Sequence, residues 1–302
     1  MGTACLRDCF EGRELGARVA EAGGAVGLAL LAGPLAEGLL LRSRAGGARA
    51  SYLLLALSGL LGAAAAAGTP ESLPREGREA LDAAAVLRSA SPFGFVRLFT
   101  QGTATLKKLA TIQMLQSTLD GKTMSDLSQI WMREHLKLSV ESIRNFAMGF
   151  GLLSAMAGKK LIPILLRATS VHSYTTLTNT TNLIAFAVRG MCERSRLFFG
   201  MLPLMLPGIN GASSAAIGMV MSSEMAAAGF GIGESTAWVN NLRALAGAAA
   251  TLIYGYFYAW CRQRGVYPGH TFALAGLLGA GLPQAILGLC VKRSELERIG
   301  AS

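Results

Sequence analysis

Charged residues are scarce in this 302-residue sequence. Asp, Glu, Lys and Arg make up 15% of it, against about 25% in a typical soluble domain. Aromatic residues contribute 7%, and only five cysteines are present. An intrinsically disordered chain is excluded, because it needs many charges and few apolar residues. A small secreted domain built on disulfide bonds is also excluded, because five cysteines are too few for this length.

Apolar residues, by contrast, make up 52% of the sequence, and the mean hydropathy is +0.43. A helix that crosses the hydrocarbon core of a bilayer needs about 20 residues of this kind. The sequence therefore predicts an all-α, multi-pass integral membrane protein, a polytopic bundle of about eight transmembrane helices. These helices are expected at 22–41, 51–68, 109–130, 146–166, 171–188, 197–221, 238–260 and 270–291.

The formal net charge is +10, from 28 basic and 18 acidic residues. The basic residues are scattered between apolar segments, which is typical of charges that flank membrane helices and meet anionic headgroups. We interpret Arg189, Arg194 and Arg196 as such charges at one membrane surface. No basic and aromatic cluster predicts nucleic-acid binding. We therefore expect the lipid bilayer, and no nucleic acid, as a partner.

The one long connection is 69–104, where Pro70 and Pro74 break any helix. A short amphipathic helix is expected around 76–88. This connection divides the chain into three expected parts: 1–68 with two membrane helices, 69–104 as a central loop, and 105–302 with six membrane helices.

Three polar residues of 109–130, namely Gln113, Gln116 and Asp120, are candidates for a solute path. They are spaced i, i+3 and i+7 and so share one face of a continuous helix. Polar groups inside a membrane are costly to bury and usually face a bundle interior or a wet cavity. The alternative is a helix near the membrane surface whose polar side meets water.

A second polar stripe, in 238–260, includes the candidate path residues Asn240 and Arg243. A cation is costly in lipid, so we expect this face to turn inward. Small residues along the stripe would allow a second helix to approach closely. The alternative is a packing seam with Arg243 at the membrane surface. The stripe comprises Asn240, Arg243, Gly247, Thr251, Tyr254 and Tyr258.

The segment 197–221 contains Pro203 and Pro207 near its middle, followed by the candidate path residues Asn210 and Ser213. Irregular backbone at membrane depth is tolerated where neighbours or water satisfy it, as in transport sites. The alternative is a plain proline kink whose free carbonyls are satisfied by serine hydroxyls.

Enzyme signals are weak. The run Gly211-Ala212-Ser213-Ser214 resembles the G-x-S-G of intramembrane serine proteases without its last glycine, with His270 as a conceivable base. Phosphate-binding and dinucleotide-binding fingerprints are absent from the sequence. We expect no enzymatic activity and no cofactor, and keep an intramembrane serine hydrolase as an alternative.

No metal site is expected, because His135 and His172 have no Cys, Asp or Glu at metal-ligand spacing. Cys192 and Cys261 are expected on the same side of the membrane. A disulfide between them is possible on an oxidising side, and two free thiols are the preferred interpretation.

Four passages together resemble the major facilitator superfamily of transporters, of the drug-efflux or tetracycline-resistance-like type. Residues 12–38 end in GPLAEG, which is similar to the G-P-x-x-G-G antiporter motif at Gly33, Pro34 and Gly38, with Glu37 in place of one glycine. Residues 70–74 (PESLP), 131–167 and 229–260 are similar to the run after the sixth helix, the region of the eighth helix, and the eleventh helix.

The resemblance implies that the eight helices are the last eight of twelve, a six-helix half plus two helices of the other half. It also makes 69–104 the central cytoplasmic loop and 171–188 a usually peripheral ninth helix. Because alternating access needs two halves, a second copy of the chain, as a homodimer, or another partner would supply the missing helices.

The function implied is transport of a small organic solute by alternating access, with efflux coupled to protons. The alternative is a non-transporting or truncated membrane paralogue.

Overall fold

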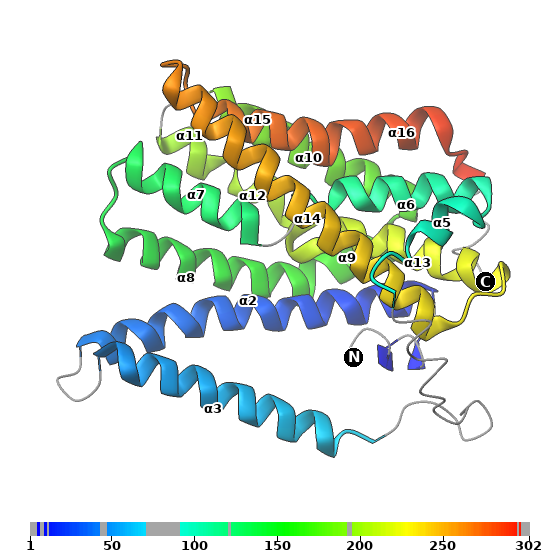
Figure 1. Cartoon of the computed structure of the whole chain (residues 1–302), viewed down its shortest axis with the longest axis horizontal. Helices are drawn as coiled ribbons and strands as arrows, with labels where there is room; N and C mark the ends of the chain where they lie inside the picture. The colour runs from blue at the N-terminus through cyan, green and yellow to red at the C-terminus, as the bar shows by residue number, and fades with distance from the viewer. Residues whose placement is uncertain are drawn as a thin grey trace.

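We describe the protein from a computed structural model that covers residues 5–6, 9–10, 12–42, 47–70, 91–119, 122–191, 195–294 and 296. The regular structure in these ranges is helical throughout (Figure 1). The elements are α2 (Gly12–Arg42), α3 (Gly47–Gly68), α5 (Val96–Thr100), α6 (Ala104–Gln116), α7 (Lys122–Glu134), α8 (Val140–Met156), η2 (Ala157–Leu161), α9 (Ile162–Ala168), α10 (Val171–Met191), α11 (Ser195–Gly200), α12 (Leu202–Met205), η3 (Leu206–Gly211), α13 (Ala212–Ala227), α14 (Ile232–Gln263), α15 (His270–Gly276), η4 (Leu277–Gly281) and α16 (Leu282–Cys290).

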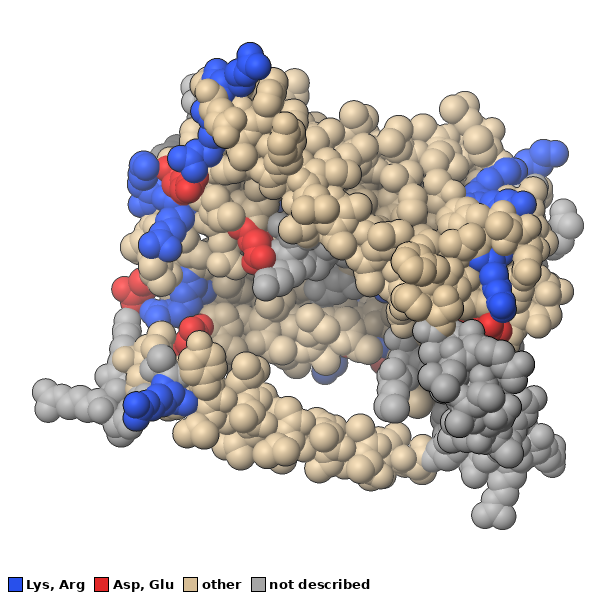
Figure 2. All heavy atoms as spheres, viewed as in Figure 1, with Lys and Arg blue, Asp and Glu red and all other residues tan. Residues whose placement is uncertain are grey.

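Six helices are long and apolar enough to cross a membrane, and they confirm six of the eight expected spans. Figure 2 shows most of the charges gathered toward the two ends of the bundle, with a belt between them that has few charges. This distribution fits a bilayer around the belt and headgroups at the ends. The chain is an integral multi-pass membrane protein. The six spans are Glu14–Leu41, Arg49–Gly68, Val140–Ala168, Leu197–Ala227, Gly233–Gln263 and His270–Cys290.

The two remaining expected spans differ from the prediction. The segment 109–130 is not one helix, because α6 ends at Gln116 and α7 begins at Lys122. The segment 171–188 does form a continuous helix, α10, but its many polar residues keep it outside the set of six apolar spans.

The connection 69–104 is only partly a loop. Its last part forms α5, which places Leu98 in the apolar core, fully buried. The amphipathic helix expected at 76–88 falls outside the described residues.

Backbone contact between α2 and α8 holds the first span against the bundle. A Cβ at Gly27 would lie 2.8 Å from the Cα of Ala155 and from the carbonyl oxygen of Gly151. A Cβ at Gly158 would lie 2.7 Å from the amide nitrogen of Gly24. Small residues allow membrane helices to approach this closely and gain dispersion contacts. Glycine is therefore required along this crossing.

Helix α3 packs against α2 and otherwise stands apart from the bundle (Figure 1). Its residues are exposed from Tyr52 to its end, and Leu53 and Leu61 are 66% and 71% exposed. A helix that is apolar on every side is stable in this position only in lipid.

Three of the six spans are interrupted near their middle. The π-helical turns η2 and η4 are each followed by a proline, Pro163 and Pro283, at the second position of the next α-helix. The third interruption is the 3₁₀ turn η3, which contains Pro207. Proline lacks an amide hydrogen and clashes with the preceding turn, which widens or tightens the helix there. The kink expected in 197–221 is thus confirmed.

Candidate functional site

The buried polar seam is a set of side chains from α6, α10 and α16, with the start of α13. Gln116 Nε2 donates to Asn179 Oδ1 at 2.9 Å, and Asn179 Nδ2 donates to Gln284 Oε1 at 3.3 Å. One turn earlier on α6, Gln113 Nε2 donates to the carbonyl oxygen of Ser214 at 3.1 Å. These bonds connect α6 to three other helices through the interior of the bundle.

The seam has spare hydrogen-bonding capacity. Gln113 and Gln116 are each 2% exposed, and Thr175 is fully buried. Within the described ranges, Gln113 Oε1, Gln116 Oε1 and Thr175 Oγ1 have no hydrogen-bond partner. A buried polar atom left without a partner costs about 1–3 kcal/mol. The seam is therefore suited to a polar guest, such as water or a solute.

The interruption η3 lies directly against α10. Tyr174 donates its hydroxyl to the carbonyl oxygen of Pro207 at 2.5 Å. A Cβ at Gly208 would lie 2.7 Å from the side-chain nitrogen of Asn182. One carbonyl of the irregular turn is thus met by a hydroxyl of α10, and satisfaction by a neighbouring helix is how irregular backbone survives at membrane depth.

This packing explains the Thr and Asn residues of α10. Thr175, Thr178, Asn179 and Asn182 are 0–7% exposed and face the bundle. The helix contacts α13, α15, α16, η3 and η4, so its polar face turns inward, whereas Leu177 and Ile184 lie on an exposed face. Interior hydroxyl and amide groups hold membrane helices together by hydrogen bonds.

The stripe expected on 109–130 is broken at its middle. Gln113 and Gln116 are buried together in the seam, but the helix ends directly after them. Asp120 falls outside the described residues. A shared helical face cannot be extended across the break, so the grouping of Asp120 with the two glutamines on one helix is wrong.

The two candidates from 197–221 lie at the η3–α13 junction. Ser213 is 6% exposed near the start of α13. The backbone of Asn210 belongs to η3, and its side chain is outside the described set. Gly211, between them, has φ +73°, a left-handed conformation that favours glycine.

The prediction that the polar stripe of 238–260 turns inward is wrong for the first half of this segment. Asn240 is exposed and Arg243 half-buried, whereas Tyr254 and Tyr258 are buried. Helix α14 crosses the bundle obliquely (Figure 1), so its buried face rotates along its length. Six of the residues that it buries follow i, i+4 spacing, which advances about 40° around the helix at each step. They are Trp238, Leu242, Ala246, Ala250, Tyr254 and Tyr258.

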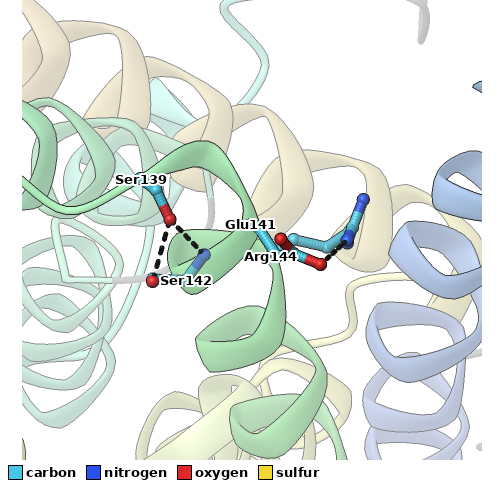
Figure 3. Close-up of polar contacts among 4 residues, drawn as sticks. All are labelled: Ser139, Glu141, Ser142 and Arg144. Atoms are coloured by element: carbon cyan, nitrogen blue, oxygen red, sulfur yellow. Dashed lines mark hydrogen bonds and ion pairs between the residues drawn. The ribbon is translucent and has the colours of Figure 1, made fainter.

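The antiporter-like motif lies within the uninterrupted helix α2, which continues through Pro34. A Cβ at Gly33 would meet open space, whereas one at Gly38 would lie 2.8 Å from a guanidinium nitrogen of Arg144. Figure 3 shows Arg144 on the first turns of α8, paired with Glu141 at 3.3 Å. Ser139 caps this helix by accepting from the amide of Ser142 at 3.1 Å. Gly38 thus makes room for a basic side chain at the membrane surface.

Arg189 was interpreted from the sequence as a surface charge, and this interpretation is wrong. It is 3% exposed, in the last turn of α10. Its guanidinium carbon lies 3.7 Å from the ring centroid of Phe198 and 5.4 Å from that of Phe272. Desolvating a charge costs several kcal/mol, and a buried cation–π contact returns about 2 kcal/mol. The only sequence signal was its position within an unusually polar helix.

An open pocket of about 360 Å³ lies at one end of the bundle, where α7 and α14 end. Arg262 is paired with Glu134 at 2.9 Å, and Tyr258 donates to the same carboxylate at 3.1 Å. The pocket is lined by Glu134, His135, Lys137, Tyr258, Arg262 and Pro268.

Ser213 and His270, the candidate residues for hydrolysis, share no hydrogen bond in the described part of the structure. His270 Nδ1 lies 3.0 Å from the carbonyl oxygen of Gly190, at the end of α10. Cys261 is a buried free thiol, and Cys192 is outside the described part of the chain. No group of three metal-ligating side chains occurs among the residues searched.

Comparison with protein-family models and with curated proteins finds no match to this chain. The likeness to the major facilitator superfamily therefore rests on the motifs quoted above.

Proposed function

We propose that this chain is a membrane transporter, similar to the major facilitator superfamily, that moves a small organic solute by alternating access. Efflux coupled to protons is the proposed mode, and further helices come from a second copy of the chain or from another partner. The buried polar seam is the observation that carries the proposal. It places unsatisfied amide and hydroxyl atoms inside a membrane bundle, where polar groups mark solute pathways.

The interrupted helices support the same function. The π-helical turn η4 contacts both α6 and α10, and η3 contacts α10. Broken helices at the level of the binding site are typical of secondary transporters, because their irregular backbone lines the site and their halves move separately. Gln284, which ends the hydrogen-bonded chain, lies three residues after η4. Movement at this turn would therefore alter the seam directly.

The test is solute flux in vesicles that contain the purified full-length chain, with and without a pH gradient. The solutes are benzenesulfonate, tetraethylammonium and glucose, which differ in charge. We expect protein-dependent flux of one class, and a loss of about tenfold in Gln116→Leu, since one hydrogen bond corresponds to roughly that factor. Gln129→Leu is the matched control, because Gln129 is exposed on α7 and, among the described residues, its side chain bonds only to Ser125 Oγ, at 3.3 Å.

Thermal stability separates transport from folding. Gln116→Leu leaves Asn179 Oδ1 without its donor but removes the unpartnered Gln116 Oε1. These two effects on stability oppose each other, so the net change should be less than about 1 kcal/mol. Flux that is absent for every solute would favour a non-transporting membrane protein. Flux that is unchanged in Gln116→Leu, Asp120→Asn and Arg243→Ala would refute these residues as the solute path. Labelling of Ser213 by a serine-reactive probe would favour the hydrolase.

The apparent mass of the native protein in its own membranes tests the partner. An antibody against residues 69–104 should detect a species well above 31.5 kDa if further helices belong to the same polypeptide. A 31.5 kDa species that chemical cross-linking converts to twice this mass would indicate a homodimer.

A further inference from the structure

Arg189 carries a positive charge in the interior of the bundle without a matching negative charge in the described structure. Its NH1 group bonds to the sulfur of Met205 at 3.3 Å, and its Nε has no partner. Among the described residues, no carboxylate lies within ion-pair distance of it. A guanidinium has five N–H donors in a planar fork that matches an oxyanion. Most of these donors are therefore available for one.

A stack of packed aromatic rings connects Arg189 to the pocket at the membrane surface. Phe198 stacks on the guanidinium on one side and on Trp131 on the other, with ring centroids 4.3 Å apart. Trp131 in turn stacks on His135, at 5.5 Å, and His135 lines the pocket. Trp131 Nε1 is itself a buried donor without a partner within the described ranges. Two aromatic side chains therefore separate the pocket residue His135 from the buried cation.

The pocket has a charge that would attract anions. Its lining contains Lys137 and Arg262 against a single carboxylate, Glu134, which is already bonded to Arg262 and Tyr258. A net positive cleft raises the local concentration of anions and their rate of entry. Its volume of about 360 Å³ is near the lower limit of small-molecule sites.

We propose that Arg189 binds the anionic group of the solute, so that the transported class is small organic anions with an aromatic or apolar body. This inference rests on the proposed function. The solute enters at the basic pocket, displaces the Trp131 and Phe198 rings, and places its carboxylate or sulfonate on the guanidinium. Its apolar body takes the place of the displaced rings against Phe186 and Phe272, which both lie within 6 Å of the guanidinium carbon.

The test is binding of benzenesulfonate to the purified full-length chain, with the neutral benzenesulfonamide as the matched ligand. We expect benzenesulfonate to raise the thermal unfolding midpoint and benzenesulfonamide not to do so. Arg189→Gln should weaken binding by about 10- to 100-fold, because a charge-assisted forked contact is lost. Arg189→Lys should have an intermediate effect. Arg264→Gln, which removes an exposed arginine after α14, should bind as the wild type does.

A second measurement uses proteins with Arg189 intact, in case Arg189→Gln does not fold. Trp131 lies on the proposed entry path, so benzenesulfonate should change the tryptophan fluorescence of the wild type. This change should disappear in Trp131→Phe and persist in Trp260→Phe. Persistence of the change in Trp131→Phe would refute the entry path.

Three results would overturn the proposal. The first is equal benzenesulfonate affinity in Arg189→Gln and the wild type, and the second is no wild-type binding of benzenesulfonate, benzoate or inorganic phosphate. The third concerns Glu193, which is near Arg189 in the sequence and lies outside the described residues: if Glu193→Gln lowers thermal stability as much as Arg189→Gln does and the wild type does not bind the anion, Arg189 belongs to an internal ion pair. Binding without flux would refute the proposed function alone, whereas flux of a neutral solute without anion binding would refute this inference alone.

Discussion

Replacing Gly27 by alanine tests whether the backbone contact between α2 and α8 is required. The new Cβ would lie 2.8 Å from the Cα of Ala155 and from the carbonyl oxygen of Gly151. Both are backbone atoms and cannot rotate aside, so the two helices must separate. Overpacking of this kind costs about 1–3 kcal/mol, and the upper end applies here. Alanine regains about 1 kcal/mol of helix propensity, so the net loss should be about 2 kcal/mol.

Gly149→Ala on the partner helix α8 is the matched control. A Cβ at Gly149 meets nothing within 4 Å, so only the propensity gain of up to about 1 kcal/mol remains. The two variants should therefore differ by about 3 kcal/mol in the free energy of unfolding, with opposite signs. Equilibrium unfolding in mixed micelles with increasing sodium dodecyl sulfate, followed by tryptophan fluorescence, measures both. Equal shifts in the two variants would refute the close packing of these helices.

Two further substitutions test single contacts, each by the thermal unfolding midpoint. Gly211→Ala should destabilise the protein by about 1–2 kcal/mol, because φ at this residue is +73° and a Cβ clashes in the left-handed region. A neutral result would contradict this geometry. The control Gly233→Ala, with open space at its Cβ, should not be destabilising. Arg262→Gln should cost less than about 1 kcal/mol, because its ion pair with Glu134 is solvent-exposed, with side chains 56% and 42% exposed. Any loss should shrink at high salt, and a loss of several kcal/mol would show that the pair is shielded from water.

Hydropathy predicts the membrane spans of this chain because it is a local property. A run of about 20 apolar residues needs no neighbour to prefer lipid, and six expected spans are present on this basis. The break between α6 and α7 has a local signal in the sequence and lies beside a contact with a distant residue. Asp120-Gly121 is a turn signal in the sequence, and Thr118, just before it, packs closely against Gly279 of η4. The turn signal alone could have located this break.

The burial of polar residues was predicted correctly on α6, but not on α14 and not for Arg189. Gln113 and Gln116 are interior as predicted, because both lie on one short straight helix. Asn240 is exposed because α14 crosses its neighbours obliquely, and a crossing angle is a property of helix pairs that no single helix encodes. The burial of Arg189 was missed because an arginine in the last turn of a helix is typical of side chains that meet lipid headgroups. Only the packing of Phe198 and Phe272 over it shows that it is interior.

The π-helical turn η4 has a mechanical consequence for the bundle. A π turn holds one more residue than the α turn that it replaces, and one residue corresponds to a rotation of about 100° around a helix axis. Conversion of η4 to α-helix would therefore turn α16 by about this angle relative to α15 without unfolding either helix. Gln284 would swing away from Asn179, and a different set of α16 side chains would face the seam. A five-residue π turn followed by proline also occurs at η2, so the same rotation applies to a second helix of this bundle.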